Sequence, residues 1–203
     1  MHAHIKTLKT FEQQTQEMSL KNLQKAEQML FHAISFQNAY SILAEHSPFL
    51  EIGRSPKRDR KDVSPADVMS IAFSTEIALK AIYQILEIKN NRSHNLKKLF
   101  CDLPDIIQTA ILEQLRKTAP THCDPYSLGG QLAAIADAFK KWRYSYEYAA
   151  LSFYPEFCAE LCKCITDVGF HLIYQEVQRY GLMTRAYPAR PLGFSLDLRE
   201  FKI

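Results

Sequence analysis

Residues 68–88 read VMSIAFSTEIALKAIYQILEI, an apolar stretch that contains neither glycine nor proline. It follows Ser64-Pro65-Ala66-Asp67, in which serine suits the cap of a helix, proline the first turn and aspartate the positive end of the helix dipole. NNRSHN, residues 90–95, then breaks the pattern. We therefore expect a long helix here, at the centre of the fold.

Apolar residues at helical spacing predict further helices around this one. The chain has only 6 glycines and few alternating β-branched runs, which also favours helices over strands. The predicted helices cover residues 19–45, 105–118, 128–148 and 155–180, with a helical turn over 96–104. The sequence thus predicts an all-α fold, an up-and-down helical bundle of about five main helices.

The chain divides into three predicted parts. Residues 1–18 form an N-terminal extension whose polar stretch FEQQTQEM reads as a frayed continuation of the first helix, and residues 19–180 form the bundle. Residues 181–203 contain prolines that exclude a helix, and Phe194, Leu196 and Leu198 alternate with polar residues. This segment is predicted to be an extended C-terminal arm.

Composition limits the classes of function only weakly. A length of 203 residues with 47% hydrophobic and 23% charged residues is typical of one globular domain, and a net charge of +3 permits contact with phosphates without requiring it. The N-terminal sequence lacks the apolar core of a signal peptide, and charges interrupt every apolar run, so no membrane span is predicted. The 5 cysteines, an odd number, favour reduced thiols and a cytoplasmic location.

The central helix carries a polar stripe, formed by Glu76, Lys80, Tyr83 and Glu87. Glu76 and Lys80 have the favourable order for an ion pair four residues apart. The stripe has two interpretations: a solvated edge of the bundle, which we favour, or the charged wall of a groove shared with another helix.

The stretch KKWRYSYEY, residues 140–148, holds the only tryptophan of the chain. Trp142 and Tyr146 continue the apolar stripe of the predicted helix 128–148, so we expect them in the core. Arg143 and Glu147 form a second pair beside that stripe. Arginine can hold a phosphate or a carboxylate, but a structural carboxylate partner is the favoured interpretation here.

The other candidate sites are a basic loop and a thiol cluster. The loop can contact a nucleic-acid backbone, although such loops are more often simply solvated, and its basic residues are Arg54, Lys57, Arg58, Arg60 and Lys61. Cys158, Cys162 and Cys164 lack the paired ligands of a tetrahedral metal site and are predicted to be packing thiols. No nucleophile or phosphate-loop motif occurs, and neither a metal nor a cofactor is predicted.

Three segments in this order, FSTEIALKAIY, SHNLKKLFCDLP and KWRYSYE, resemble the HEPN domains (higher eukaryotes and prokaryotes nucleotide-binding) over about residues 20–180. The resemblance implies a helical module, usually homodimeric, of bacterial toxin–antitoxin, defence and nucleotide-related systems. Many HEPN proteins are metal-independent RNases with an RxxxxH-type motif, in which histidine moves a proton and arginine stabilises the charged phosphorane. The histidine of SHNL, His94, resembles a turn and capping element of the family.

The chain departs from that catalytic pattern. After Arg143, the histidine offsets hold Tyr148, Ala149 and Ala150, and the one formal match, Arg116 to His122, crosses Pro120 and is not taken as a site. The leading hypothesis is a non-catalytic, cytoplasmic HEPN-like homodimer that binds RNA, a nucleotide or a protein partner such as an antitoxin or a nucleotidyltransferase, with no membrane contact. The alternatives are an RNase toxin with an atypical site of Arg143, Glu147 and His94, and a structural adaptor whose C-terminal arm clasps a partner.

Overall fold

The structure, a computed structural model, describes residues 2–46, 65–89, 92–122, 125–143 and 153–179, and within them the side chains of residues 20–45, 65–89, 92–122, 128–141 and 153–179. The described residues form helices and no strand, which confirms the all-α prediction. The helices are α1 (His2–His46), α2 (Pro65–Ile85), α3 (Leu96–Cys101), α4 (Asp105–Thr118), α5 (Pro125–Ile135), α6 (Ala138–Arg143) and α7 (Pro155–Arg179), with a 3₁₀ turn at Pro120–His122.

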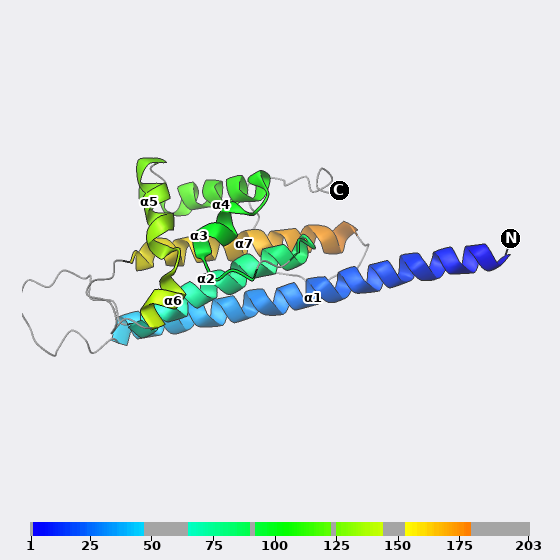
Figure 1. Cartoon of the computed structure of the whole chain (residues 1–203), viewed down its shortest axis with the longest axis horizontal. Coiled ribbons are helices and arrows are strands. Elements are labelled where there is room, and N and C mark those ends of the chain that lie inside the picture. The colour runs from blue at the N-terminus through cyan, green and yellow to red at the C-terminus, as the bar shows by residue number, and fades with distance from the viewer. Residues whose placement is uncertain (1, 47–64, 90–91, 123–124, 144–152, 180–203) are drawn as a thin grey trace, which may run out of the picture.

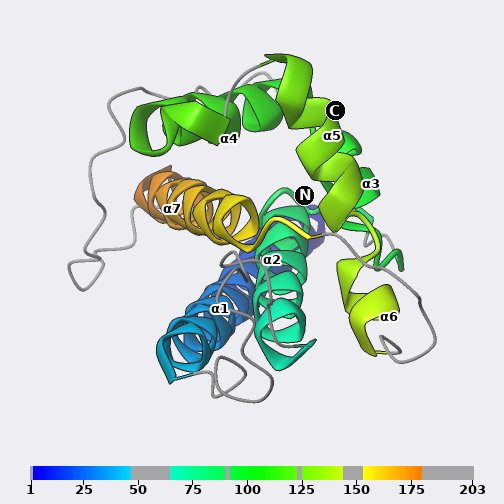
Figure 2. The same ribbon diagram turned by 90° about the vertical axis from the view of Figure 1, so that its left-hand side faces the viewer.

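Helix α2 occupies the centre of the bundle, as the sequence predicts. It packs against α1, α7, α6 and α3, and Figure 2 shows α1, α2 and α7 grouped together, with α4 lying over α7. Val68, Ile71, Leu79 and Ile82 of α2 are fully buried. Burial on several sides explains why this helix is apolar nearly all round.

Helix α1 begins at His2 rather than near Ser19, so residues 2–18 continue the first helix. Leu23, Ala26, Leu30 and Ala33 lie at helical spacing and are buried against the bundle. The N-terminal half of α1 projects past the other helices in Figure 1. The last predicted helix matches α7, and its predicted stripe is buried: Phe157, Leu161, Cys164, Val168 and Leu172.

The prediction of one helix over residues 128–148 is wrong, because α5 ends at Ile135 and α6 begins at Ala138. The backbone amide of Leu96 donates to the carbonyl of Ala136 at 2.7 Å. In an uninterrupted helix that carbonyl would accept from the amide four residues further on. A contact from a distant part of the chain therefore takes the place of a helical bond at the break.

The turn that follows α2 contains a left-handed residue that is not glycine. Glu87 has φ of 52°, the Ile88 amide donates to the Tyr83 carbonyl at 3.0 Å, and the Glu87 amide donates to the Gln84 carbonyl at 3.4 Å. These two bonds are those of a Schellman motif, which satisfies the last carbonyls of a helix. Glu87 thus takes the place that glycine usually has in this motif.

Candidate functional site

Glu76 and Lys80 form the predicted pair on one face of α2. The ammonium Nζ of Lys80 lies 2.7 Å from Glu76 Oε1, and the two side chains are 18% and 4% exposed, respectively. The favoured interpretation of the polar stripe as a solvated edge is wrong for Glu76 and Tyr83, because both residues are buried. A buried carboxylate is costly without a partner, so the nearby ammonium stabilises this position of Glu76.

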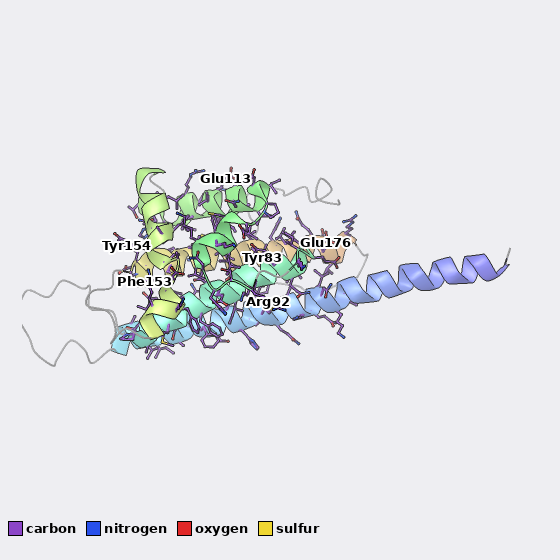
Figure 3. The ribbon with its side chains drawn as sticks, in the orientation of Figure 1. Tyr83, Arg92, Glu113, Phe153, Tyr154 and Glu176 are labelled. Atoms are coloured by element: carbon purple, nitrogen blue, oxygen red, sulfur yellow. The ribbon has the colours of Figure 1, made fainter. Side chains whose placement is uncertain are left out.

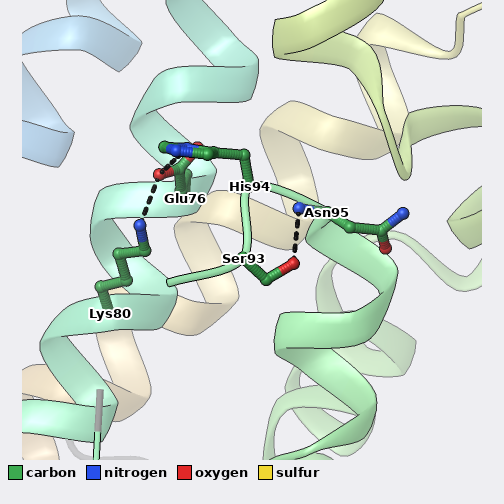
Figure 4. A network of polar contacts seen from close by, with 5 residues as sticks. All are labelled: Glu76, Lys80, Ser93, His94 and Asn95. Atoms are coloured by element: carbon green, nitrogen blue, oxygen red, sulfur yellow. Dashed lines mark hydrogen bonds and ion pairs between the residues drawn. The ribbon is translucent and has the colours of Figure 1, made fainter. Parts of the chain in front are cut away.

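His94 joins this pair from the segment between α2 and α3. Its Nδ1 lies 2.9 Å from the same oxygen, Glu76 Oε1, while 62% of its side chain is exposed. Figure 4 shows the imidazole and the ammonium converging on one carboxylate. The structure therefore brings together three of the residues selected from the sequence, and we call Glu76, Lys80 and His94 the triad.

Asn95, and not His94, caps α3. The Asn95 side chain accepts from the Lys98 amide at 2.8 Å and donates to Asp137 Oδ1 at 3.0 Å. The backbone amide of Asn95 donates to Ser93 Oγ at 3.0 Å, as Figure 4 shows. The role of capping element expected for His94 thus falls to the next residue, and the bonds of Asn95 hold the segment in place so that His94 reaches Glu76.

A row of rings ends at His94. Phe36 of α1 meets Phe73 of α2 edge-on with ring centroids 4.8 Å apart, and Phe73 stacks on Phe139 of α6 at 5.4 Å. The imidazole of His94 lies nearly parallel to the Phe139 ring at 6.3 Å. The position of the imidazole is therefore defined by a ring on one side and by the Glu76 carboxylate at Nδ1.

The second oxygen of Glu76 has a different environment. Oε2 is buried, and within the described part of the chain it has no hydrogen-bond partner. Among the described residues, the cationic partners of Glu76 therefore lie at Oε1: Lys80, and His94 when the imidazole is protonated. The carboxylate can hold both groups in place while they face a ligand.

Most of the remaining predicted site residues lie outside the described part of the chain. Helix α6 packs against α2 and ends at Arg143, but the Arg143 side chain and the whole of Glu147 are outside the described residues. The same holds for the basic loop with Arg54, Lys57, Arg58, Arg60 and Lys61. Arg116 and His122 are separated by the end of α4 at Thr118, and the His122 ring instead contacts Phe157 edge-on at 5.9 Å.

Tyr83 has a structural role in the interior. Its hydroxyl donates to the Leu99 carbonyl at 2.9 Å and so ties α2 to α3. Burial, with smaller contributions from Asp102 and Cys101, raises the pKa of Tyr83 to about 12. Figure 3 labels Tyr83 among the other side chains.

The thiols of α7 are packing groups, as the sequence predicts. Cys158, Cys162 and Cys164 are fully buried, and the first two contact Thr75 and Ser74 at 3.3 and 3.1 Å. Burial raises the pKa of all three thiols, that of Cys164 to about 12, and it lowers the pKa of His171. The described residues include no group of three or more His, Cys, Asp or Glu side chains that could hold a metal.

Sequence reasoning missed three residues around the triad: Asn95, Asp137 and Phe139. Asn95 could have been found, because asparagine immediately before LKKLF is a typical helix cap. Asp137 and Phe139 gave no such signal, because ADAF reads as the interior of a helix. Their roles depend on the break between α5 and α6.

Helix α2 is the one described helix that is long and apolar enough to cross a membrane by length and composition. Within the structure, 67% of its apolar window is buried in the bundle. A core helix of a soluble protein has this character, and the structure is compatible with one.

No protein-family model, curated protein or solved structure matches this chain. The geometry of the triad and the sequence resemblance therefore carry the functional proposal.

Proposed function

We propose that this protein is a HEPN-like helical module that binds RNA or a nucleotide through Lys80 and His94 without cleaving it. The observation that carries the proposal is that both groups share Glu76 Oε1 while His94 remains 62% exposed. An ammonium and an imidazolium are good donors to phosphate oxygens. The buried carboxylate holds them in position before a ligand arrives, which lowers the entropy cost of binding.

The proposal extends to residues whose side chains lie outside the described part. Arg143 is the last residue of α6, which packs against α2, and its guanidinium would add a bidentate phosphate contact, with Glu147 as its partner. The basic residues from Arg54 to Lys61 would add contacts to a nucleic-acid backbone. We place the module in the cytoplasm, in a bacterial toxin–antitoxin or defence system.

The absence of a histidine at the RxxxxH offsets after Arg143 supports a non-catalytic role. A second candidate function, a metal-independent RNase, is favoured by one specific observation. A carboxylate at Nδ1 orients an imidazole so that its other nitrogen can act as a general base. His94 has this carboxylate in Glu76, and Arg143 and Glu147 would complete such a site.

One experiment separates the two functions. Fluorescence anisotropy with a labelled single-stranded RNA measures binding at low salt, and gel electrophoresis of the same RNA with excess chelator measures cleavage. We expect binding that weakens in His94→Gln and Arg143→Ala, and intact RNA. His32→Gln, on the exposed face of α1, is the matched control.

If the protein cleaves RNA without a metal and Arg143→Ala abolishes the cleavage, the RNase replaces the binding module as the proposed function. Toxicity on expression in a bacterial host, relieved by Arg143→Ala, would support the same change. If neither binding nor cleavage occurs, the nucleic-acid proposal is wrong.

We further propose that the module is a homodimer whose partner in the cell is an antitoxin or a nucleotidyltransferase. Large apolar side chains remain exposed on α1, among them Phe31 at 51% and Phe36 at 37%, and a second copy would cover such groups. Light scattering gives the mass of the full chain and of a variant that ends at Tyr180. An unchanged dimer in the shortened variant would exclude the C-terminal arm as the clasp.

A further inference from the structure

The two ring nitrogens of His94 have different surroundings. Nδ1 lies 2.9 Å from Glu76 Oε1, and a carboxylate that is paired with an ammonium acts as an acceptor, so Nδ1 carries a proton. The remaining nitrogen, Nε2, belongs to an imidazole that is 62% exposed, and it has no hydrogen-bond partner among the described residues. A second proton would sit at Nε2 and would make it a donor to a ligand.

Lys80 presents further donors near the imidazole of His94. An ammonium has three protons, of which Glu76 Oε1 accepts one at 2.7 Å, and the Lys80 side chain is 18% exposed. Because Lys80 Nζ and His94 Nδ1 bind the same oxygen, the two groups are neighbours. They form a compact pair of donors, whereas a groove that follows a nucleic-acid strand needs a row of cations.

The charge of the triad changes with His94. Glu76 and Lys80 balance one another when the imidazole is neutral, and a protonated imidazole gives the triad a net positive charge. Glu76 is 4% exposed, and among the described residues its Oε2 has no hydrogen-bond partner, so the described partners of this carboxylate are the two groups at Oε1.

The groups that face His94 from the surrounding elements are few. Helix α2 contributes Glu76 and Lys80, and α6 contributes the uncharged ring of Phe139. Asp137 binds Asn95 at 3.0 Å and lies 4.0 Å from Lys141. Within the described residues, the acidic group in contact with the imidazole is therefore Glu76.

We propose that Lys80 and His94 bind one terminal phosphate monoester, of a free nucleotide or of an RNA end. This inference rests on the proposed function, because it names the part of the ligand that the triad contacts. Two adjacent donors suit a single phosphoryl group. A monoester carries more negative charge than a backbone diester and so gains more from the imidazolium.

The test follows the histidine side chains by ¹⁵N nuclear magnetic resonance during titration with adenosine monophosphate, adenosine or inorganic phosphate. In the free protein His94 should show the tautomer protonated at Nδ1. Adenosine monophosphate should bind about tenfold or more tightly than adenosine, because the difference includes charge-assisted hydrogen bonds. The resonances of His94 should shift with adenosine monophosphate and not with adenosine.

His94→Gln should lose about tenfold in affinity for adenosine monophosphate, and Lys80→Arg, which keeps the charge, should lose less. His32→Gln, with an exposed histidine on α1, should bind as the unchanged protein does.

A pair of RNAs with and without a 5′-phosphate distinguishes the two sources of the monoester. Stronger binding of the phosphorylated RNA assigns the site to an RNA end, and a preference confined to the mononucleotide assigns it to a free nucleotide. The inference is wrong if adenosine and its monophosphate bind alike, or if His94→Gln leaves the affinity unchanged. RNA binding that ignores the terminal phosphate would preserve the proposed function and overturn this inference. If phosphate shifts the His94 resonances but RNA does not bind, the phosphate site stands and the proposal of RNA binding is wrong.

Discussion

Glu76 carries a carboxylate into the interior of the bundle, where its side chain is 4% exposed. Removing a charge from water costs several kcal/mol, and a close partner recovers the cost only when its geometry is good. Lys80 at 2.7 Å supplies that geometry from one turn further along α2. His94, which is far more exposed, adds a contact whose strength depends on its protonation.

Lys80→Met should therefore destabilise the fold by about 3 kcal/mol, because it leaves Glu76 buried without its nearest cation. Urea denaturation followed by circular dichroism measures the change. Lys163→Met is the matched control: its partner Glu160 is 3.9 Å away and both side chains are well exposed, so the loss should be below about 0.5 kcal/mol. Equal losses in the two variants would show that Lys80 does not balance the charge of Glu76.

At this scale the sequence predicted the pair and missed its surroundings. The order of Glu76 and Lys80 on a helix was sufficient to predict their contact. The burial of Glu76 was missed because a polar stripe reads as a solvent-facing edge, whereas in the structure His94 lies against Glu76. The contact of His94 with Glu76 joins residues 18 positions apart, and helical spacing on α2 does not encode it.

Local sequence signals predict the bounds of α4, whereas they do not predict the break between α5 and α6. Pro104 and Asp105 mark the start of α4, Pro120 marks its end, and the predicted range agrees with the structure. No glycine or proline stands between Ile135 and Ala138. The break arises from bonds that Leu96 and Asn95 make from another part of the chain, which helical spacing does not encode.

Two glycine substitutions should have opposite effects on the helices that carry them. A Cβ at Gly130 of α5 would meet nothing within 4 Å, so Gly130→Ala should stabilise the protein by about 0.5–1 kcal/mol through helix propensity. A Cβ at Gly169 of α7 would lie 3.0 Å from both terminal methyl carbons of Leu30, which is fully buried. Gly169→Ala should be destabilising by about 1 kcal/mol or more, because overpacking outweighs propensity.

Urea denaturation of the two variants under identical conditions tests this difference. A stabilising effect of Gly169→Ala as large as that of Gly130→Ala would mean that α1 and α7 approach one another less closely than the structure has them. The size of the gap between the two variants reports the tightness of this contact.

Several ionisable side chains lie in the interior of the protein. The thiols of Cys158, Cys162 and Cys164 are protonated in the folded state well above their ordinary pKa of 9.0, because burial raises the pKa of each. Tyr40 and Tyr83, whose pKa values burial raises to about 12, behave in the same way. Folding therefore opposes the loss of protons from several sites at once.

The free energy of unfolding should consequently fall in alkaline solution. Below about pH 9 the thiols are protonated in both states, and their contribution to stability is fully present. Between pH 9.0 and about 12 the unfolded chain releases protons that the folded chain retains, so each thiol lowers stability by up to about 1.4 kcal/mol per pH unit. Urea midpoints measured with a reductant from neutral pH upward test the slope, and a variant with alanine at all three positions should show a shallower one. A slope unaffected by that variant would contradict the assignment.

The bond between the Leu96 amide and the Ala136 carbonyl, at 2.7 Å, has a consequence for hydrogen exchange. Amides in the first turn of a helix usually have no helical partner and exchange rapidly with solvent. The Leu96 amide should instead exchange slowly, and only when α3 separates from the junction of α5 and α6. Asn95→Ala removes the neighbouring bond to Asp137 and should speed exchange at Leu96 while leaving Val168 in α7 protected. The exchange rate of this single amide would thus report how often the segment that carries His94 detaches from the rest of the protein in solution.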